Sequence, residues 1–205
     1  GRMVMSADML HIKWHDVVLY PAGYFARRIP IALEVTVPQG WDIATALDAD
    51  VKSGSRTQFK TIDLDTVVDS PMVAGRYSKK IDLDPNGRSR VTLNVFGDKE
   101  DLIEAKPAHI DAHRNLIKQA DKLFGARHFD HYDFLLYLTD RQAGDGLEHH
   151  RSSENGPGQK YFTEWDKNAA GRDLLPHEFT HSWNGKFRRP ADLWTPNFNV
   201  PMRDS

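Results

Sequence analysis

The feature that most constrains this chain is the run L-L-P-H-E-F-T-H-S-W-N-G-K-F-R-R-P at residues 174–190. His177 and His181 are four residues apart, so on a helix their side chains lie on one face, one turn apart. Two imidazoles in this register can bind one metal ion. Glu178 is rotated by about 100° from His177, so it is poorly placed as a co-ligand but can reach a water on that ion. The pattern H-E-x-x-H therefore predicts a zinc site suited to hydrolysis, with Glu178 as the base.

The boundaries of this helix can also be predicted. Asp173 is suited to the N-cap, and Pro176 falls in the first turn, where its missing N–H costs little. The pair Asn184-Gly185 is a typical helix stop. We therefore expect a helix of about three turns.

The third protein ligand of the zinc ion is not evident. The chain has no cysteine, so histidine and carboxylate must supply every ligand. Catalytic zinc takes three protein ligands and leaves one position to water. The residue three positions after Gly185 is Arg188, so no third histidine extends the motif. Asp192 and Asp204 are the carboxylates that follow His181, and neither lies on a convincing second helix.

Composition limits the class of protein. Of the 205 residues, 40% are hydrophobic and 27% are charged, with a formal net charge of −2, which is typical of a globular protein without a broad basic surface. The chain has no apolar run long enough to span a membrane. We therefore expect no nucleic-acid or membrane partner. The first ten residues lack the apolar core of a signal peptide, and we expect both ends to have been cut from a longer chain. We expect a cytoplasmic protein, with a periplasmic location as the alternative if the longer chain carries a signal peptide.

Hydrophobic patterning indicates an α+β fold with two parts. Residues 14–90 are β-rich, with expected strands at residues 31–37, 60–62, 67–68 and 90–97. An apolar stripe over residues 110–124 predicts an amphipathic helix that Gly125 ends. The apolar run at residues 134–138 predicts a buried strand, residues 140–172 should be mostly loop, and residues 146–149 could form a short edge strand. We place the domain boundary near residue 88, between a β domain (1–88) and an α/β domain (89–205).

The motifs resemble those of a known family. The run H-E-F-T-H-S-W-N-G-K-F-R-R-P is similar to the H-E-x-x-H-x-W-N motif of the glycyl aminopeptidases, which are zinc metallopeptidases (gluzincins) with a thermolysin-like catalytic domain. Residues 146–153, G-L-E-H-H-R-S-S, resemble the second signature of this family, G-L-E-H-x-x-S. Residues 19–24 (L-Y-P-A-G-Y) and 69–71 (D-S-P) are similar to its N-terminal region. The resemblance thus extends over nearly the whole chain.

The resemblance implies a function and a division of the chain. Residues 1–88 would be the C-terminal part of an N-terminal β domain, and residues 89–205 the truncated first part of the catalytic domain. The third zinc ligand would be a glutamate on a later helix, beyond Ser205. The activity would be removal of small N-terminal residues, glycine or alanine, from peptides with a free N-terminus, and Glu148 would bind the α-amine of the substrate. The chain by itself would then be inactive and would bind zinc weakly.

Other readings remain open at this point. Glu148 could be a solvated loop residue, and His149 is more suited to a structural role than to metal binding. His128, Asp130, His131 and Asp133 form a second group of metal-ligand types, although the aromatic residues between them favour a core position. The protein could also be a non-catalytic peptide-binding module, a pseudoenzyme, or a zinc endopeptidase on the same fold. An endopeptidase has no free amine to bind, so Glu148 distinguishes that alternative.

Overall fold

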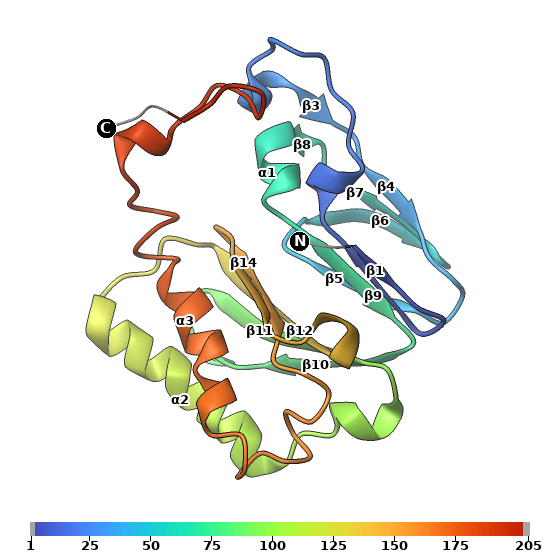
Figure 1. Ribbon diagram of the computed structural model, residues 1–205, viewed down its shortest axis with the longest axis vertical. Helices are drawn as coiled ribbons and strands as arrows, with labels where there is room; N and C mark the ends of the chain where they lie inside the picture. The colour runs from blue at the N-terminus through green and yellow to red at the C-terminus, as the bar shows by residue number, and fades with distance from the viewer. Residues whose placement is uncertain (1–2, 203–205) are drawn as a thin grey trace.

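The computed structural model describes residues 3–202, which fold into a β-rich N-terminal part and an α/β part (Figure 1). In the N-terminal part, a four-stranded sheet has the order β1-β2-β9-β5, a three-stranded sheet has the order β4-β7-β6, and β3 pairs with β8. The bounds of these elements are β1 Val4–Met5, β2 Met9–Ile12, β3 Pro30–Ile31, β4 Glu34–Thr36, β5 Asp42–Thr45, β6 Ala49–Ser53, β7 Arg56–Phe59, β8 Ile62–Asp63, α1 Leu64–Val68 and β9 Met72–Gly75.

The α/β part is built on one mixed sheet of five strands in the order β10-β11-β12-β14-β13. The three central strands are parallel, and the two edge strands run antiparallel to their neighbours. Helices α2 and α3 lie together on one side of this sheet, and the N-terminal strands lie on the other (Figure 1). The bounds are β10 Tyr77–Asp82, β11 Arg90–Gly97, α2 Pro107–Phe124, β12 His131–Leu138, β13 Asp145–Glu148, β14 Ser152–Gly156 and α3 Leu174–Thr180.

Strand β12 shows how the two parts are joined. All of its eight residues are buried, because both faces of the central sheet are covered. Phe134 and Leu136 face the core under the helices. Leu135 and Tyr137, on the opposite face, pack in a separate cluster whose other members are Phe96 and three residues of the N-terminal sheet, Met9, Ala44 and Val73. This alternation explains the continuous apolar run and fixes the N-terminal part against the back of the sheet.

Several predicted elements are confirmed and others are wrong. The helix that ends at Gly125, the strand at residues 90–97, the buried strand and the edge strand are all present, and Gly125 has φ +68°, as a helix-ending glycine often does. The single strand expected at residues 31–37 is two strands that pair with different partners. The strand expected at residues 67–68 is the end of helix α1, which begins where the carboxylate of Asp63 accepts a hydrogen bond from the amide of Thr66 (3.0 Å).

The division of the chain near residue 88 stays a prediction. Strand β10 belongs to the sheet of the α/β part through its antiparallel pairing with β11. No helix in the described part of the chain is both long and apolar enough to cross a membrane.

Candidate metal and peptidase site

Helix α3 carries the H-E-x-x-H motif and is anchored by its apolar face. Leu175 and Phe179 are each 1% exposed and pack in the core beneath the helix. Trp183, just after the helix, stacks on Phe124 with ring centroids 4.4 Å apart and donates a hydrogen bond from Nε1 to the carbonyl of Ala126 (2.6 Å). Because this face is held so firmly, the orientation of the other face, with the two histidines, is fixed.

The helix is shorter than its sequence predicts. It ends at Thr180, and residues 181–183 continue as a turn. Asp173 stands at the N-cap position but has helical backbone angles and makes no capping hydrogen bond, because a 3₁₀ turn at residues 170–172 leads directly into the helix. The one-turn spacing of the histidines is unaffected by this difference.

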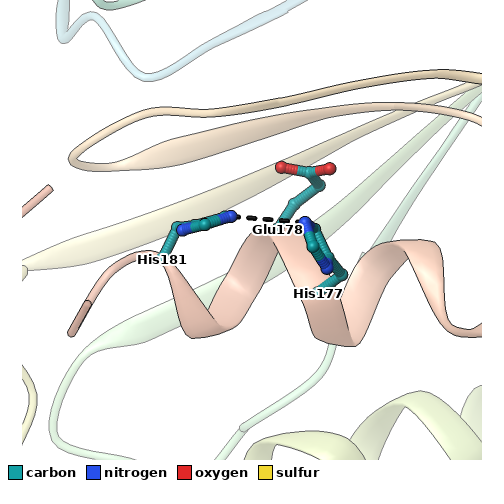
Figure 2. Close-up of side chains that lie close together, drawn as sticks. All are labelled: His177, Glu178 and His181. Atoms are coloured by element: carbon teal, nitrogen blue, oxygen red, sulfur yellow. Dashed lines mark hydrogen bonds between the residues drawn. The ribbon is translucent and has the colours of Figure 1, made fainter. Parts of the chain in front are cut away.

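The two histidines converge on one point. Their Nε2 atoms lie 3.3 Å apart, and the two rings, with planes at 80° to each other, point toward one another on one side of the helix (Figure 2). Zinc–nitrogen bonds of about 2.0–2.1 Å at a tetrahedral angle place two ligand nitrogens about 3.3 Å apart. The Nδ1 atom of His181 lies 2.9 Å from the carbonyl oxygen of Asn184, an arrangement in which Nδ1–H donates to the carbonyl and Nε2 is directed at His177. The donor atoms therefore fit a zinc ion.

Glu178 completes this group. A carboxylate oxygen of Glu178 and one nitrogen from each histidine lie within 4.8 Å of one another. The side chain is buried, and burial raises the pKa of Glu178 above its ordinary value; the positive charge of His177 opposes this, while the charge of Glu148 adds to it. A carboxylate with a raised pKa close to two metal-binding imidazoles has the properties of a general base.

Among residues 3–202, no further histidine or carboxylate joins the two imidazoles and Glu178. Asp192 lies in a short 3₁₀ helix and is not part of the group, and Asp204 lies outside the described residues. Within the described part of the chain, the group therefore consists of two imidazoles and the carboxylate of Glu178.

Strand β13 brings Glu148 to the same place. This edge strand packs against α3, and Gly146 faces the helix so closely that a Cβ there would lie 2.4 Å from Oε1 of Glu178 and 2.6 Å from Cδ1 of Leu174. Glu148, two residues further on, is the last residue of the strand and is half-buried. In the described structure, its carboxylate takes part in no hydrogen bond or ion pair.

A cleft opens beside Glu148. It has a volume of about 920 Å³ and lies between the N-terminal part, the end of β13 and the segment that follows the motif helix. Its lining includes Leu147, Glu148, Lys186, Phe187 and Trp194. The three motif residues are not part of this lining. Glu148 lines the cleft and also interacts electrostatically with Glu178.

A second group of donor atoms was not foreseen from the sequence. His11 on β2, Asp145 on β13 and Glu154 on β14 bring one nitrogen and two oxygens within 4.8 Å. The ammonium of Lys13 already lies among them, 3.3 Å from Oδ2 of Asp145 and 3.5 Å from Oε1 of Glu154. Nε2 of His11 also lies 2.5 Å from Oε1 of Glu154, so these four side chains form a mostly buried network of ion pairs and hydrogen bonds. The sequence signal is the alternation of Met9 and His11 on β2 with Lys13 just after it, and all three are buried.

The cluster suggested by His128, Asp130, His131 and Asp133 does not form a ligand group in the described part of the chain. Nδ1 of His131 lies 2.9 Å from Oδ2 of Asp133, and Oδ1 of Asp133 accepts a hydrogen bond from the side-chain amide of Asn94 (3.0 Å). His128 instead stacks on Phe187 with ring centroids 3.6 Å apart.

Comparison with family models supports the resemblance seen in the motifs. Residues 1–76 match the model described as the peptidase M61 N-terminal domain, and residues 170–205 match that of the M61 glycyl aminopeptidases. Together the matches fall on the N-terminal part and on the motif helix. None of the curated proteins is significantly similar to the chain.

Solved structures with the same fold are aminopeptidase-like. An aminopeptidase N family protein from Idiomarina loihiensis is 21% identical, with a TM-score of 0.73 over 89% of this chain and 32% of that one. Yeast LTA4 hydrolase is 15% identical in its complex with bestatin (TM-score 0.56, 86% of this chain and 26% of that one). The native form of yeast LTA4 hydrolase is 13% identical, with a TM-score of 0.53 over 87% of this chain and 27% of that one. The predicted fold class is confirmed: a β-rich N-terminal domain precedes the first part of a thermolysin-like α/β domain. The chain spans about a third or less of the length of these proteins.

Proposed function

Since this chain belongs to the M61 glycyl aminopeptidase family, we propose that it is part of a zinc-dependent aminopeptidase that removes small N-terminal residues, glycine or alanine, from peptides. The observation that carries the proposal is the convergence of the Nε2 atoms of His177 and His181 at 3.3 Å beside the carboxylate of Glu178. The preference for glycine and alanine comes from the family resemblance. The cytoplasmic location stays a prediction.

His177, His181 and Glu178 would have different roles in hydrolysis. His177 and His181 would hold the zinc ion, and the third ligand implied by the family resemblance is a glutamate outside the described residues. Zinc, when bound, polarises the scissile carbonyl and makes a water more acidic. Glu178 accepts the proton of the attacking water and then delivers it to the nitrogen of the leaving amine, so the carboxylate ends the cycle as it began.

Glu148 would select the substrate. An ammonium group forms charge-assisted hydrogen bonds with a carboxylate, and these are roughly twice as strong as neutral ones. The carboxylate of Glu148 has no partner among the described residues, lines the cleft, and belongs to the strand that packs on the motif helix. A free N-terminus bound there would lie close to the catalytic group, whereas an internal peptide segment would offer no charge to it. This arrangement favours an aminopeptidase over an endopeptidase.

The 205-residue chain itself should be a weak zinc binder. Among residues 3–202 only two imidazoles are available, and such a pair would leave half of the tetrahedral positions of zinc to water. We expect equilibrium dialysis of this chain to give a zinc affinity weaker than micromolar, and we expect no peptidase activity. Sub-micromolar binding would mean that a third ligand is already present.

The test of the function uses a protein of full family length that carries this sequence. It should hydrolyse glycine p-nitroanilide, lose activity with a chelator and regain it with zinc. The N-acetylated substrate should be cleaved at least about a hundredfold more slowly, because it presents no ammonium to Glu148. Equal rates on both substrates would point to an endopeptidase, and no hydrolysis of either by the zinc-loaded protein would favour a peptide-binding module.

A further inference from the structure

Asp69, in the N-terminal part of the chain, contacts both segments that carry the candidate site. It follows helix α1 directly, and its carboxylate is mostly buried. Oδ2 accepts hydrogen bonds from the backbone amide of His150 (2.8 Å) and lies 2.7 Å from Nδ1 of the same residue. Oδ1 accepts one from Nζ of Lys186 (2.9 Å) and lies 3.2 Å from Nδ1 of His149. One carboxylate therefore joins two segments that are distant in sequence.

The first of these segments is the end of the amine-binding strand. His149 and His150 directly follow Glu148, the last residue of β13. The ring of His149 is held from its other side too, since Nε2 lies 3.3 Å from Oε2 of Glu154, which is fully buried. Both ring nitrogens thus meet carboxylates, one from the N-terminal part and one from the central sheet. The backbone that carries Glu148 has little freedom to move as a result.

The second segment is the turn that supports a metal-binding histidine. The carbonyl of Asn184 accepts the hydrogen bond from Nδ1 of His181 (2.9 Å), and Lys186 returns a backbone hydrogen bond to the carbonyl of His181 (3.0 Å). The side chain of Lys186 then reaches Asp69. The turn that fixes the ring of His181 is therefore tied to the same carboxylate as the strand that carries Glu148.

We infer that Asp69 is a positioning residue that sets Glu148 relative to the imidazoles of His177 and His181. The inference rests on the proposed function for the roles of these three residues, but the tie between the two segments is independent of it. Its consequence is that the N-terminal domain takes part in selecting a free substrate amine. Without the carboxylate of Asp69, the position of Glu148 relative to the two imidazoles should vary more, while both segments remain folded.

The first test measures how the contacts of Asp69 stabilise the two segments, and it does not depend on enzyme activity. Hydrogen exchange of backbone amides is compared in the 205-residue chain for the wild type and for Asp69→Asn, which keeps the size of the side chain and removes its charge. Exchange at residues 147–151 and 184–187 should rise by about tenfold or more, since hydrogen bonds to a charged, mostly buried group are lost. Glu34→Ala, which removes an exposed ion pair with Arg56 in the same domain, should leave both segments unchanged. Wild-type exchange in Asp69→Asn would overturn the inference.

The second test separates positioning from a general loss of structure. In the family-length protein, Asp69→Asn should raise KM for glycine p-nitroanilide by about tenfold and reduce the discrimination against the N-acetylated substrate. Asp69→Glu, which restores the charge, should recover part of this loss. A fall in kcat alone, in proportion to unfolded protein and with KM and discrimination unchanged, would overturn the inference. If the wild type does not hydrolyse the substrate at all, the proposed function fails, and the exchange experiment still decides on Asp69.

Discussion

A Cβ atom on Gly146 would lie 2.4 Å from Oε1 of Glu178, a distance that no unstrained structure allows. Glycine at this position lets the edge strand pack closely on the motif helix, and a larger residue would have to displace the carboxylate of Glu178. The Leu174 side chain, with Cδ1 2.6 Å from the same point, would have to move as well. Two motifs separated by about thirty residues in the sequence are thus parts of one site.

Gly146→Ala should displace Glu178 and reduce kcat by about a hundredfold or more in the family-length protein, because small misplacements of a catalytic group are costly. Gly40→Ala is the control: its Cβ would meet nothing within 4 Å, and only its φ of +82° adds strain, of roughly 1 kcal/mol. The control should lose stability with kcat intact. Normal activity in Gly146→Ala would show that the contact does not position the base.

Glu178→Gln should leave zinc bound and lower kcat by roughly a thousandfold, since the amide keeps the size of the side chain but cannot accept a proton. Metal analysis by atomic absorption and steady-state kinetics on the family-length protein measure the two effects separately. His177→Ala is the companion variant and should lose the metal together with activity. A Glu178→Gln enzyme with wild-type turnover would refute the assignment of the base.

How far the sequence predicts this site depends on whether each contact is local. His177, Glu178 and His181 share one helical turn, so helix geometry alone predicts their convergence. Glu148 could be assigned only through the family resemblance, because its closeness to α3 depends on the pairing of β13 with β14 and on the glycine that permits it. The role of Asp69 depends on how the two parts of the chain pack, and no local pattern encodes that.

The secondary structure likewise could be predicted where local sequence determines it and could not where contacts with distant residues do. The strand at residues 90–97 and the helix that Gly125 ends follow from periodicity and a turn residue. The strand expected at residues 67–68 is wrong because the capping hydrogen bond from Thr66 to Asp63 outweighs the β preference of two valines. Strand β14 lies within residues that were expected to be mostly loop. Its residues, S-S-E-N-G, are all buried: the carboxylate of Glu154 contacts His11 and His149, and the side-chain amide of Asn155 donates a hydrogen bond to Ser153 in the same strand.

Lys13→Met should destabilise the chain by about 3–5 kcal/mol, because it leaves the carboxylates of Asp145 and Glu154 without their buried cation. Urea unfolding followed by circular dichroism measures the free energy of unfolding. Lys60→Met, which removes an exposed ion pair with Asp48, should change it by less than about 1 kcal/mol. Similar effects of the two substitutions would mean that Lys13 does not neutralise the buried group.

The free energy of unfolding should depend on pH through the buried contacts of His149 with Asp69 and Glu154. Burial raises the pKa of Asp69 and of Glu154, but the hydrogen bonds and positive charges of their histidine partners outweigh it, so both pKa values lie well below the ordinary range. Burial likewise lowers the pKa of His149, and its contacts with Asp69 and Glu154 outweigh this and raise it.

The signs of these shifts define the window of greatest stability. The two carboxylates stabilise the fold above their unfolded pKa values of about 4, and this contribution is lost as pH falls through the lower folded values. The contribution of His149 is fully present below its unfolded pKa of about 6.5 and is lost as pH rises through the higher folded value. The free energy of unfolding should therefore be greatest near pH 5–6, and His149→Asn should flatten the decline at alkaline pH. A wild-type stability that increases from pH 6.5 to 8.5 would contradict this assignment.

The most direct measurement of the central claim is anomalous X-ray diffraction at the zinc edge from crystals of the 205-residue chain in millimolar zinc. We expect a zinc peak about 2.0–2.1 Å from Nε2 of both His177 and His181. A peak between His11, Asp145 and Glu154 with none at the motif helix, or imidazoles of His177 and His181 that point apart, would contradict it.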